Sequence, residues 1–278
     1  MKHWDPHKIL HLPWYAAMQP AFQPLAEHAA WPSHADYQSL LQQRPQSIQS
    51  ANGKVLRVVA QSSEKTSDWQ QAYEARLYLH GELQTRLESW HDCFNLLTWA
   101  TFPAAKAALN AAQFALLAAQ AEAPSAPGRR SPKQDALTQL DESGVLILCA
   151  EPALSQLLLA FQWKPLFWEK RAQVTVQMRC FLFGHGLMER ALMPYPGLTG
   201  KGVVLSVAAE LLQQPLALQL AEADRRLVQV LKDAGCLMHP RDLAPIPILG
   251  FPGFTPDSAC AEYYDDQRYF RPGRTLKP

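Results

Sequence analysis

The sequence predicts a single α+β domain, in which a small, mostly antiparallel sheet packs with a long buried helix and further helices. Residues 90–121 are mostly Ala and Leu, and after the first turn they carry one charged side chain, Lys106, which indicates a buried helix. Residues 173–183 place apolar side chains on one face and polar side chains on the other, as a strand does. Residues 215–234 show helical apolar spacing and end before Gly235, a residue type common after helices.

An N-terminal arm is expected to precede this domain. Residues 1–50 are rich in Pro, His, Gln and Trp, and Trp4, Trp14 and Trp31 are suited to anchor an irregular segment on the body. No repeat or low-complexity linker divides the remainder. We therefore expect residues 51–278 to fold as one α+β domain with the arm packed on it.

Local signals predict the other elements. Ser89 and Asp92 have the spacing of a capping box at the start of the long helix. Pro103 is expected to kink that helix or to begin a second segment. Turn residues and short apolar runs predict the remaining strands. They are a strand at 55–60, a hairpin of 73–79 with 82–86, a hairpin of 135–140 with 145–149, and a last strand at 261–270. Further helices are predicted at 36–43, from Pro152 onward and at 185–193.

Composition and charge argue against several classes of function. The 278 residues contain 26 Lys and Arg and 25 Asp and Glu, so the net charge of +1 gives no overall attraction to nucleic acid or to an anionic membrane. No uncharged apolar run reaches the roughly 20 residues of a membrane span. The five cysteines form no C-x-x-C pair, which favours reduced thiols, and the N-terminus lacks the apolar core of a signal peptide. We therefore expect a cytoplasmic protein that does not bind a membrane, and nucleic acid is disfavoured as its partner.

Polar side chains of the long helix gather on one face. At 100° per residue, one arc of about 100° contains His91, Asp92, Asn95, Lys106, Asn110 and Gln113. A buried cation or amide is costly unless it is paired, so this stripe faces either a cavity or a polar network. In a catalytic site, His91 would be a base or metal ligand, Lys106 would hold an anion, and Asn95 and Asn110 would orient the substrate. The alternative is a structural network that ties the helix to its neighbours.

A second candidate group follows the predicted strand at 173–183. His185 and Glu189 are four residues apart, so they lie on one face of the predicted helix. Such a pair can bind a metal or share a proton. A local hydrogen bond without function is the alternative, because H-x-x-x-E alone is a weak motif.

Charged residues elsewhere supply two further groups. Asp135, Asp141 and Glu142 surround a predicted hairpin turn, and Arg130 before them is suited to grip an anionic ligand. Asp265 lies among acidic and aromatic residues near the end of the chain. Each group has an ordinary alternative, because turn carboxylates and loop arginines are usually solvated and charges often protect an edge strand.

Several short motifs occur in order between about residues 73 and 274. They are Thr85-Arg86, Trp90-His91-Asp92, Phe94-Asn95, Trp99, Phe102-Pro103, Lys106, Leu109-Asn110, Asp135-Ala136-Leu137-Thr138, Asp141-Glu142, Phe183-Gly184-His185, Glu189, Tyr264-Asp265-Asp266 and Phe270-Arg271-Pro272. In this combination the chain resembles an uncharacterised bacterial family, a domain of unknown function. The resemblance implies a single-domain soluble protein and brings no known activity. In that family a histidine often stands where this chain has Gln113, so a metal ligand at that position would be missing here.

The main functional hypothesis is an enzyme with hydrolase-type acid–base chemistry on a small polar or anionic substrate. Walker A, G-x-G-x-x-G, G-x-S-x-G and zinc-finger patterns are absent from the sequence, which disfavours P-loop, Rossmann and α/β-hydrolase chemistry. A divalent metal is an open alternative, with His185, Glu189, His91 and Asp92 as candidate ligands. The expected catalytic residues are His91, Lys106, His185, Glu189 and Asp141, and the expected substrate-binding residues are Asn95, Asn110, Arg130, Asp135 and Asp265.

Two other classes stay open. In the first, the protein is a non-catalytic binding or scaffold protein, with a buried structural network and with exposed Trp-rich and Pro-rich segments as its interaction surface. In the second, Arg129-Arg130 and Arg225-Arg226 with interleaved aromatic residues would bind nucleic acid, against which the near-zero net charge argues.

Overall fold

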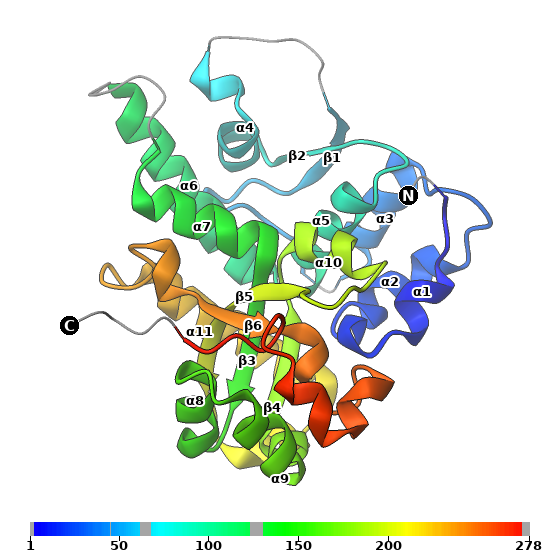
Figure 1. Cartoon of the computed structure of the whole chain (residues 1–278). Helices are drawn as coiled ribbons and strands as arrows, with labels where there is room; N and C mark the ends of the chain where they lie inside the picture. The colour runs from blue at the N-terminus through cyan, green and yellow to red at the C-terminus, as the bar shows by residue number, and fades with distance from the viewer. Residues whose placement is uncertain (1–2, 45, 62–67, 123–129, 274–278) are drawn as a thin grey trace.

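The computed structural model describes residues 3–44, 46–61, 68–122 and 130–273 (Figure 1). The helices are α1 (His7–His11), α2 (Gln19–Ala26), α3 (His34–Gln42), α4 (Tyr73–His80), α5 (Trp90–Thr101), α6 (Pro103–Glu122), α7 (Pro132–Ser143), α8 (Pro152–Leu159), α9 (Arg171–Gln177), α10 (His185–Ala191) and α11 (Leu216–Lys232). The strands are β1 (Arg57–Ala60), β2 (Glu82–Thr85), β3 (Gly144–Cys149), β4 (Met178–Leu182), β5 (Thr199–Ser206) and β6 (Ala244–Pro247). The predicted α+β class is confirmed.

The larger sheet is mixed, with two antiparallel pairings and one parallel pairing. Its strand order is β4-β3-β5-β6; β3 runs antiparallel to β4 and parallel to β5, and β5 runs antiparallel to β6. All six residues of β3 are buried, as expected of a central strand covered on both faces. Strands β1 and β2 form a second, parallel pair. The predicted antiparallel pairing therefore holds for β3–β4 and β5–β6, whereas the parallel pairings β3–β5 and β1–β2 were not predicted.

The long apolar segment forms two helices with a break where the sequence places Pro103. Every residue of α5 except His91 is buried, which confirms the predicted buried helix there. Phe102 leaves the helical conformation, with φ −125° and ψ 61°, and α6 then begins at Pro103. In α6 the buried residues are confined to the first turns, where they include Lys106 and Asn110.

Several predicted strands are helices or turns. Residues 73–79 belong to α4, and residues 135–140 belong to α7, whose start at Pro132 is fixed by a capping box of Ser131 and Gln134. Residues 173–177 belong to α9, and the Arg179 guanidinium donates hydrogen bonds to the carbonyls of Thr175 and Met178 at the end of this helix. Residues 261–265 form a 3₁₀ turn.

The N-terminal arm is part of the core. Trp4 and Trp14 are 5% and 4% exposed, and the Trp4 ring stacks on Trp90 of α5 with a centroid distance of 4.8 Å. Tyr15 stacks on Phe94 of α5 and donates a hydrogen bond to the carbonyl of Met188 in α10. These tryptophans are therefore anchors, and they do not form the exposed interaction surface that the scaffold hypothesis requires.

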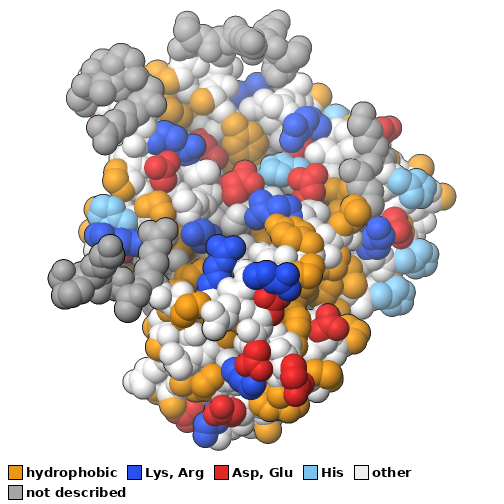
Figure 2. All heavy atoms as spheres, in the orientation of Figure 1, with side chains coloured by type: hydrophobic (Ala, Val, Ile, Leu, Met, Phe, Trp, Pro, Cys, Tyr) orange, Lys and Arg blue, Asp and Glu red, His pale blue; other side chains and the backbone are white. Residues whose placement is uncertain are grey.

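The surface shows mixed charge. In the face of Figure 2, basic and acidic side chains are interspersed. Arg225 and Arg226 both pair with Glu222 at 2.6 Å, and Arg129 lies outside the described residues. Among the described residues, no helix is long and apolar enough to cross a membrane.

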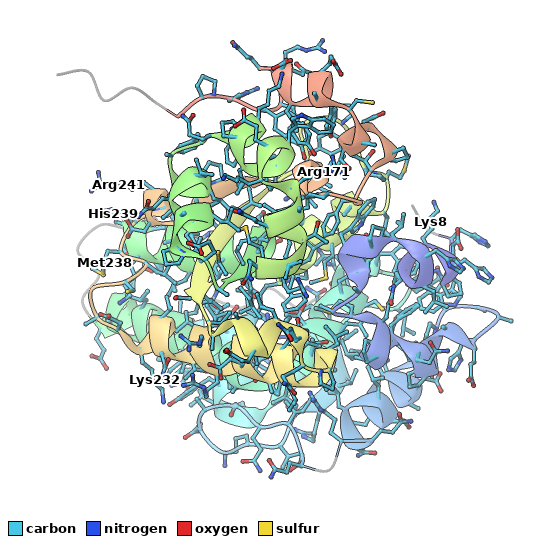
Figure 3. The ribbon with its side chains drawn as sticks, turned by 90° about the horizontal axis from the view of Figure 1, so that it is seen from below. Lys8, Arg171, Lys232, Met238, His239 and Arg241 are labelled. Carbon is cyan, nitrogen blue, oxygen red and sulfur yellow. The ribbon has the colours of Figure 1, made fainter. Side chains whose placement is uncertain are left out.

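Helix α11 matches its predicted amphipathic character. It packs against α6 and β5 and buries Leu220, Ala223 and Leu227. Seen from below, α11 ends at Lys232, and the chain then turns through Met238, His239 and Arg241 on the same side of the molecule (Figure 3).

Candidate functional site

Three helix ends meet beside the central strand. Helix α7 runs directly into β3, and β4 leads into α10 through residues 183 and 184. Because β3 and β4 are antiparallel neighbours, with Val145 opposite Leu182, the end of α7 lies next to the start of α10. Helix α10 also packs against α5. This topology brings together His91 at the start of α5, Asp141 and Glu142 at the end of α7, and His185 at the start of α10.

Two glycines permit this close approach. A Cβ atom on Gly184 would lie 2.3 Å from the backbone nitrogen of Gly144 and 2.4 Å from that of Ser143. A Cβ atom on Gly186 would lie 2.3 Å from Oε2 of Glu142. All three distances are far below van der Waals contact, so a larger residue at position 184 would push α10 away from α7, and one at position 186 would displace the Glu142 side chain.

His91, Glu142 and His185 form what we call the histidine cluster. Oε1 of Glu142 lies 3.4 Å from Nε2 of His185 and 3.9 Å from Nε2 of His91. The two rings meet edge to face with a centroid distance of 4.4 Å. One potential ligand atom from each of the three residues lies within 4.8 Å of the others. The hydrogen bond with His185 lowers the pKa of Glu142, so this carboxylate is ionised at neutral pH.

A second carboxylate faces the other ring nitrogen of each histidine. Nδ1 of His91 lies 3.2 Å from Oε2 of Glu189, and Nδ1 of His185 lies 3.9 Å from Oδ1 of Asp141. The His185 side chain is buried, and its Nδ1 has no hydrogen-bond partner among the described residues. Each imidazole is thus placed between two acids.

Lys106 reaches the same site through Asp141. Its Nζ lies 2.5 Å from Oδ1 of Asp141, and it also lies 5.7 Å from the centroid of the Trp99 ring. Although burial disfavours an ionised carboxylate, Lys106 and His185 hold the pKa of Asp141 below its usual value. The predicted helix stripe and the predicted His185 group therefore share one carboxylate.

The amides of the stripe bond to α4. Nδ2 of Asn110 donates to Oε2 of Glu74 at 2.5 Å, and Nδ2 of Asn95 donates to the hydroxyl of Tyr73 at 2.7 Å. Burial, together with the nearby charge of Asp141, raises the pKa of Glu74 to about 7. The carbonyl oxygens of Asn95 and Asn110 are buried without a partner among the described residues, so the network is not fully satisfied.

A cavity of about 220 Å³ opens onto this arrangement, and we call it the polar cavity. Asp92 borders it but is held by Arg86, whose Nε and Nη2 lie 3.0 and 2.8 Å from the two carboxylate oxygens. The candidate ligand Asp92 is thus engaged elsewhere. The lining residues are Gln61, Tyr73, Glu74, Gln84, Arg86, His91, Asp92, Asn95, Asp141, Glu142 and His185.

Three of the predicted binding residues lie elsewhere. Arg130 pairs with Asp135 at 3.5 Å across the first turn of α7, at the opposite end of that helix from Asp141. Asp265 forms an exposed ion pair with Lys164 at 2.6 Å. None of these residues lines the polar cavity.

Sequence reasoning missed the contribution of α4. Tyr73 and Glu74 carry no distinctive motif, and the segment was expected to be a strand. The sequence places Glu142 in a candidate group around a predicted turn, but it does not mark it as a partner of the two histidines. Its one signal was its place directly after Asp141 in the motif shared with the family that the chain resembles.

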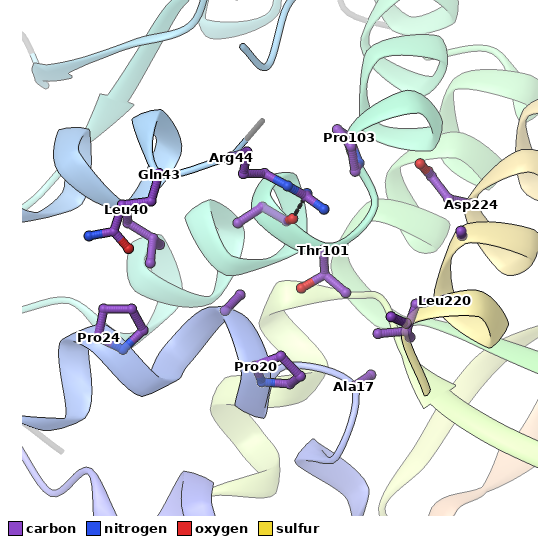
Figure 4. A pocket seen from close by; sticks show the side chains of 14 residues that line it. Ala17, Pro20, Pro24, Leu40, Gln43, Arg44, Thr101, Pro103, Leu220 and Asp224 are labelled. Carbon is purple, nitrogen blue, oxygen red and sulfur yellow. Dashed lines mark hydrogen bonds between the residues drawn. The ribbon is translucent and has the colours of Figure 1, made fainter. Parts of the chain in front are cut away.

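A larger cavity of about 400 Å³ lies on another part of the molecule (Figure 4). Its charged groups are already used in the fold. The Arg44 guanidinium donates to the carbonyl of Ala100, and Asp224 accepts hydrogen bonds from the amides of Ala104 and Ala105 at the start of α6. The remaining lining is mostly apolar, including Pro20, Pro24, Leu40, Pro103 and Leu220. The polar cavity is the better candidate for chemistry.

Comparison with known proteins places the chain in a family. The family model described as "Protein of unknown function (DUF3025)" matches residues 56–274, and the chain belongs to this family. Neither the comparison with curated proteins nor the comparison with solved structures found a significant match.

Proposed function

We propose that the polar cavity is the active site of an enzyme that hydrolyses a small polar substrate. The observation that carries the proposal is the convergence of His91, His185 and Glu142 on one point of a cavity whose lining is polar. Three basic atoms around one position suit the binding and deprotonation of a water molecule. The cavity volume of about 220 Å³ lies below the usual range of drug-sized pockets, so the substrate, or the part of it that reacts, is small.

The surrounding residues have roles consistent with hydrolysis. Glu189 and Asp141 face the outer nitrogens of the two histidines and would hold the rings in position. Asn95 lines the cavity and donates to the hydroxyl of Tyr73, so it would orient the substrate through that hydroxyl. Lys106 would fix and neutralise Asp141, because its Nζ is bonded to that carboxylate and is not free to hold an anion.

The charge of the cavity lining indicates which charge the substrate carries. Four carboxylates (Glu74, Asp92, Asp141 and Glu142) line the cavity, and the permanently charged cation in the lining is Arg86. Arg86 compensates Asp92 and Lys106 compensates Asp141, so the described lining offers no uncompensated Lys or Arg to hold an anionic substrate. An uncharged polar substrate, such as a small ester or amide, is therefore favoured.

A substrate panel tests the proposal. We expect wild-type protein to hydrolyse at least one of a set of small chromogenic esters, amides and phosphate esters. His185→Ala and His91→Ala should lower kcat/KM by about 100-fold or more, since general acid–base groups contribute roughly that much. His80→Ala, an exposed histidine at the end of α4, is the control and should keep full activity. Absence of turnover across the panel, or equal loss in the control, would contradict the proposal.

A further inference from the structure

We propose that the histidine cluster binds one divalent first-row transition-metal ion through Nε2 of His91, Nε2 of His185 and the carboxylate of Glu142. Both Nε2 atoms face the same oxygen, Oε1 of Glu142, at 3.9 and 3.4 Å. Ligand atoms about 2.0–2.1 Å from a tetrahedral metal lie about 3.3 Å from one another. The His185–Glu142 distance already fits that spacing. The His91–Glu142 distance needs a shift of less than about 1 Å, which the Glu142 side chain, 42% exposed, is free to make.

The outer nitrogens support the same assignment. A histidine that binds metal through one nitrogen usually donates the N–H of the other to a carboxylate. Both histidines have such an acid at Nδ1: Glu189 at 3.2 Å for His91 and Asp141 at 3.9 Å for His185. The buried Nδ1 of His185 lacks a hydrogen-bond partner, and a metal at Nε2 would fix its proton on Nδ1 toward Asp141. Glu189 and Asp141 are thus positioning residues.

The donor set and the local charge select the kind of ion. Two imidazole nitrogens with one carboxylate suit Zn²⁺, Fe²⁺ and similar ions, whereas Mg²⁺ and Ca²⁺ prefer oxygen ligands throughout. Asp92 and Asp141 are compensated by Arg86 and Lys106, but among the described residues Glu142 pairs only with histidines, which favours a bound cation beside it. Three protein ligands leave a coordination position open for water on the cavity side, as in catalytic metal sites.

This inference rests on the proposed function only for the role of the metal in catalysis. A bound metal would ease deprotonation of the water molecule that the proposed reaction uses. Metal binding itself is independent of any substrate. The two proposals therefore fail separately. Binding of metal without hydrolysis upholds the metal site and contradicts the proposed function, whereas hydrolysis by a chain that binds no metal does the reverse.

The test is titration of full-length, chelator-treated protein with Zn²⁺, followed by elemental analysis after dialysis. We expect about one ion per chain in wild type, and binding at least 100-fold weaker in His185→Ala and in Glu142→Gln. The second variant guards against misfolding, because Glu142 is half-exposed whereas His185 is buried. Asp135→Asn, which changes a half-exposed acid on the same helix as Glu142 but outside the polar cavity, is the matched control and should bind as wild type does. Mg²⁺ should not compete.

Two further measurements identify the ion that binds and test the positioning residue Glu189. The same titration with Fe²⁺, carried out in the absence of oxygen, shows which ion is preferred. The site is supported if either ion binds at one per chain and this binding is lost in both His185→Ala and Glu142→Gln. Glu189→Gln should weaken Zn²⁺ binding 10- to 100-fold and change the visible spectrum of the Co²⁺-loaded protein, while the melting temperature of the metal-free protein stays unchanged. No binding by wild type, or binding equal to wild type in both ligand variants, would overturn the proposal.

Discussion

Asp141 is the most heavily shared group of the site, because its Oδ1 atom lies 2.5 Å from Lys106 and 3.9 Å from His185. The ion pair with Lys106 is shielded from water, with side-chain exposures of 5% and 13%. A buried charge that loses its partner retains the full cost of desolvation. The lysine therefore supports the geometry of His185 as well as the packing of α6 on α7.

Replacement of Lys106 should destabilise the protein strongly. We expect Lys106→Met to lower the free energy of unfolding by about 3–5 kcal/mol, the cost typical of breaking a buried ion pair. Urea denaturation provides the measurement. The control is Lys164→Met, whose exposed pair with Asp265 has a similar distance and should cost less than about 1 kcal/mol. Equal losses in the two variants would show that the Lys106 pair is not shielded as described.

Glu74 should give the stability a characteristic pH dependence. Its pKa is raised from 4.5 to about 7 in the folded chain, so its contribution to stability is complete below pH 4.5 and is lost as the pH rises through 7. Glu74→Gln cannot ionise and can keep a bond to Asn110. We expect the variant to gain stability relative to wild type between pH 5 and 8, measured by urea denaturation of chelator-treated protein. A constant difference across this range would refute the assigned pKa.

Sequence reasoning found the residues of the helix stripe because polar groups on an otherwise apolar helix stand out. It placed His91, Asn95, Lys106 and Asn110 correctly on one side, although the break at Phe102 interrupts the regular spacing. It did not find their partners on α4. Glu74 lies in a segment of ordinary composition, and its role depends on a contact with Asn110 that lies 36 positions further along the chain.

At the scale of elements, the junction of α7, β3, β4 and α10 carries the site. Gly184 allows this junction, because the atoms that its Cβ would meet belong to the backbone of Ser143 and Gly144 and cannot rotate away. By contrast, the atom that a Cβ on Gly186 would meet first is the end of the flexible Glu142 side chain. Replacement of Gly184 should therefore disturb the junction more than replacement of Gly186, whose first neighbour can move aside.

We expect Gly184→Ala to lower the free energy of unfolding by about 1–3 kcal/mol, the usual cost of overpacking. Chemical denaturation measures the loss. Gly235→Ala is the control, because the added carbon would meet only Oδ1 of Asp233, at 3.4 Å, and should change stability little. A Gly184→Ala protein as stable as the control would mean that α10 and α7 are further apart than described.

A second prediction concerns the start of α6. Asp224 of α11 accepts hydrogen bonds from the amides of Ala104 and Ala105, at 3.1 and 2.7 Å, and so supplies a cap from another helix. We expect Asp224→Ala to cost about 1–2 kcal/mol of stability, because the buried amide of Ala105 and the partly buried amide of Ala104 lose their acceptor. Asp224→Asn keeps an acceptor oxygen and should cost less. Thermal unfolding of both variants checks the order, and the reverse order would exclude the capping role.

The strands and helices that were predicted wrongly show what local patterns omit. Residues 173–177 alternate like a strand, yet Val176 is 51% exposed and the segment is a helix whose end is capped by Arg179. Residues 73–79 alternate similarly but form α4, which packs on α6. Short segments of this kind take their conformation from tertiary contacts, whereas the long apolar helices were recognisable from composition alone.

At the scale of the whole molecule, the N-terminal arm completes the core beneath the site. The family match begins at residue 56, but the arm contributes buried Ile9, Tyr15, Phe22 and Tyr37. Tyr15 connects the two helices that carry the histidines, by stacking on Phe94 of α5 and bonding to Met188 of α10. The arm is therefore expected to be required for folding, and not only for contact with another protein.

Deletion of residues 1–50 should accordingly abolish the cooperative fold. The truncated chain would expose apolar surface of α5, and we expect it to lose its near-UV circular dichroism and its sharp thermal transition. Tyr15→Phe is the milder companion variant: it leaves the carbonyl of Met188 without its donor and should cost about 1–3 kcal/mol while the fold persists. If the truncated chain melted cooperatively at the wild-type temperature, the arm would be a peripheral segment, and the scaffold hypothesis, in which residues 1–50 bind a partner, would regain its basis.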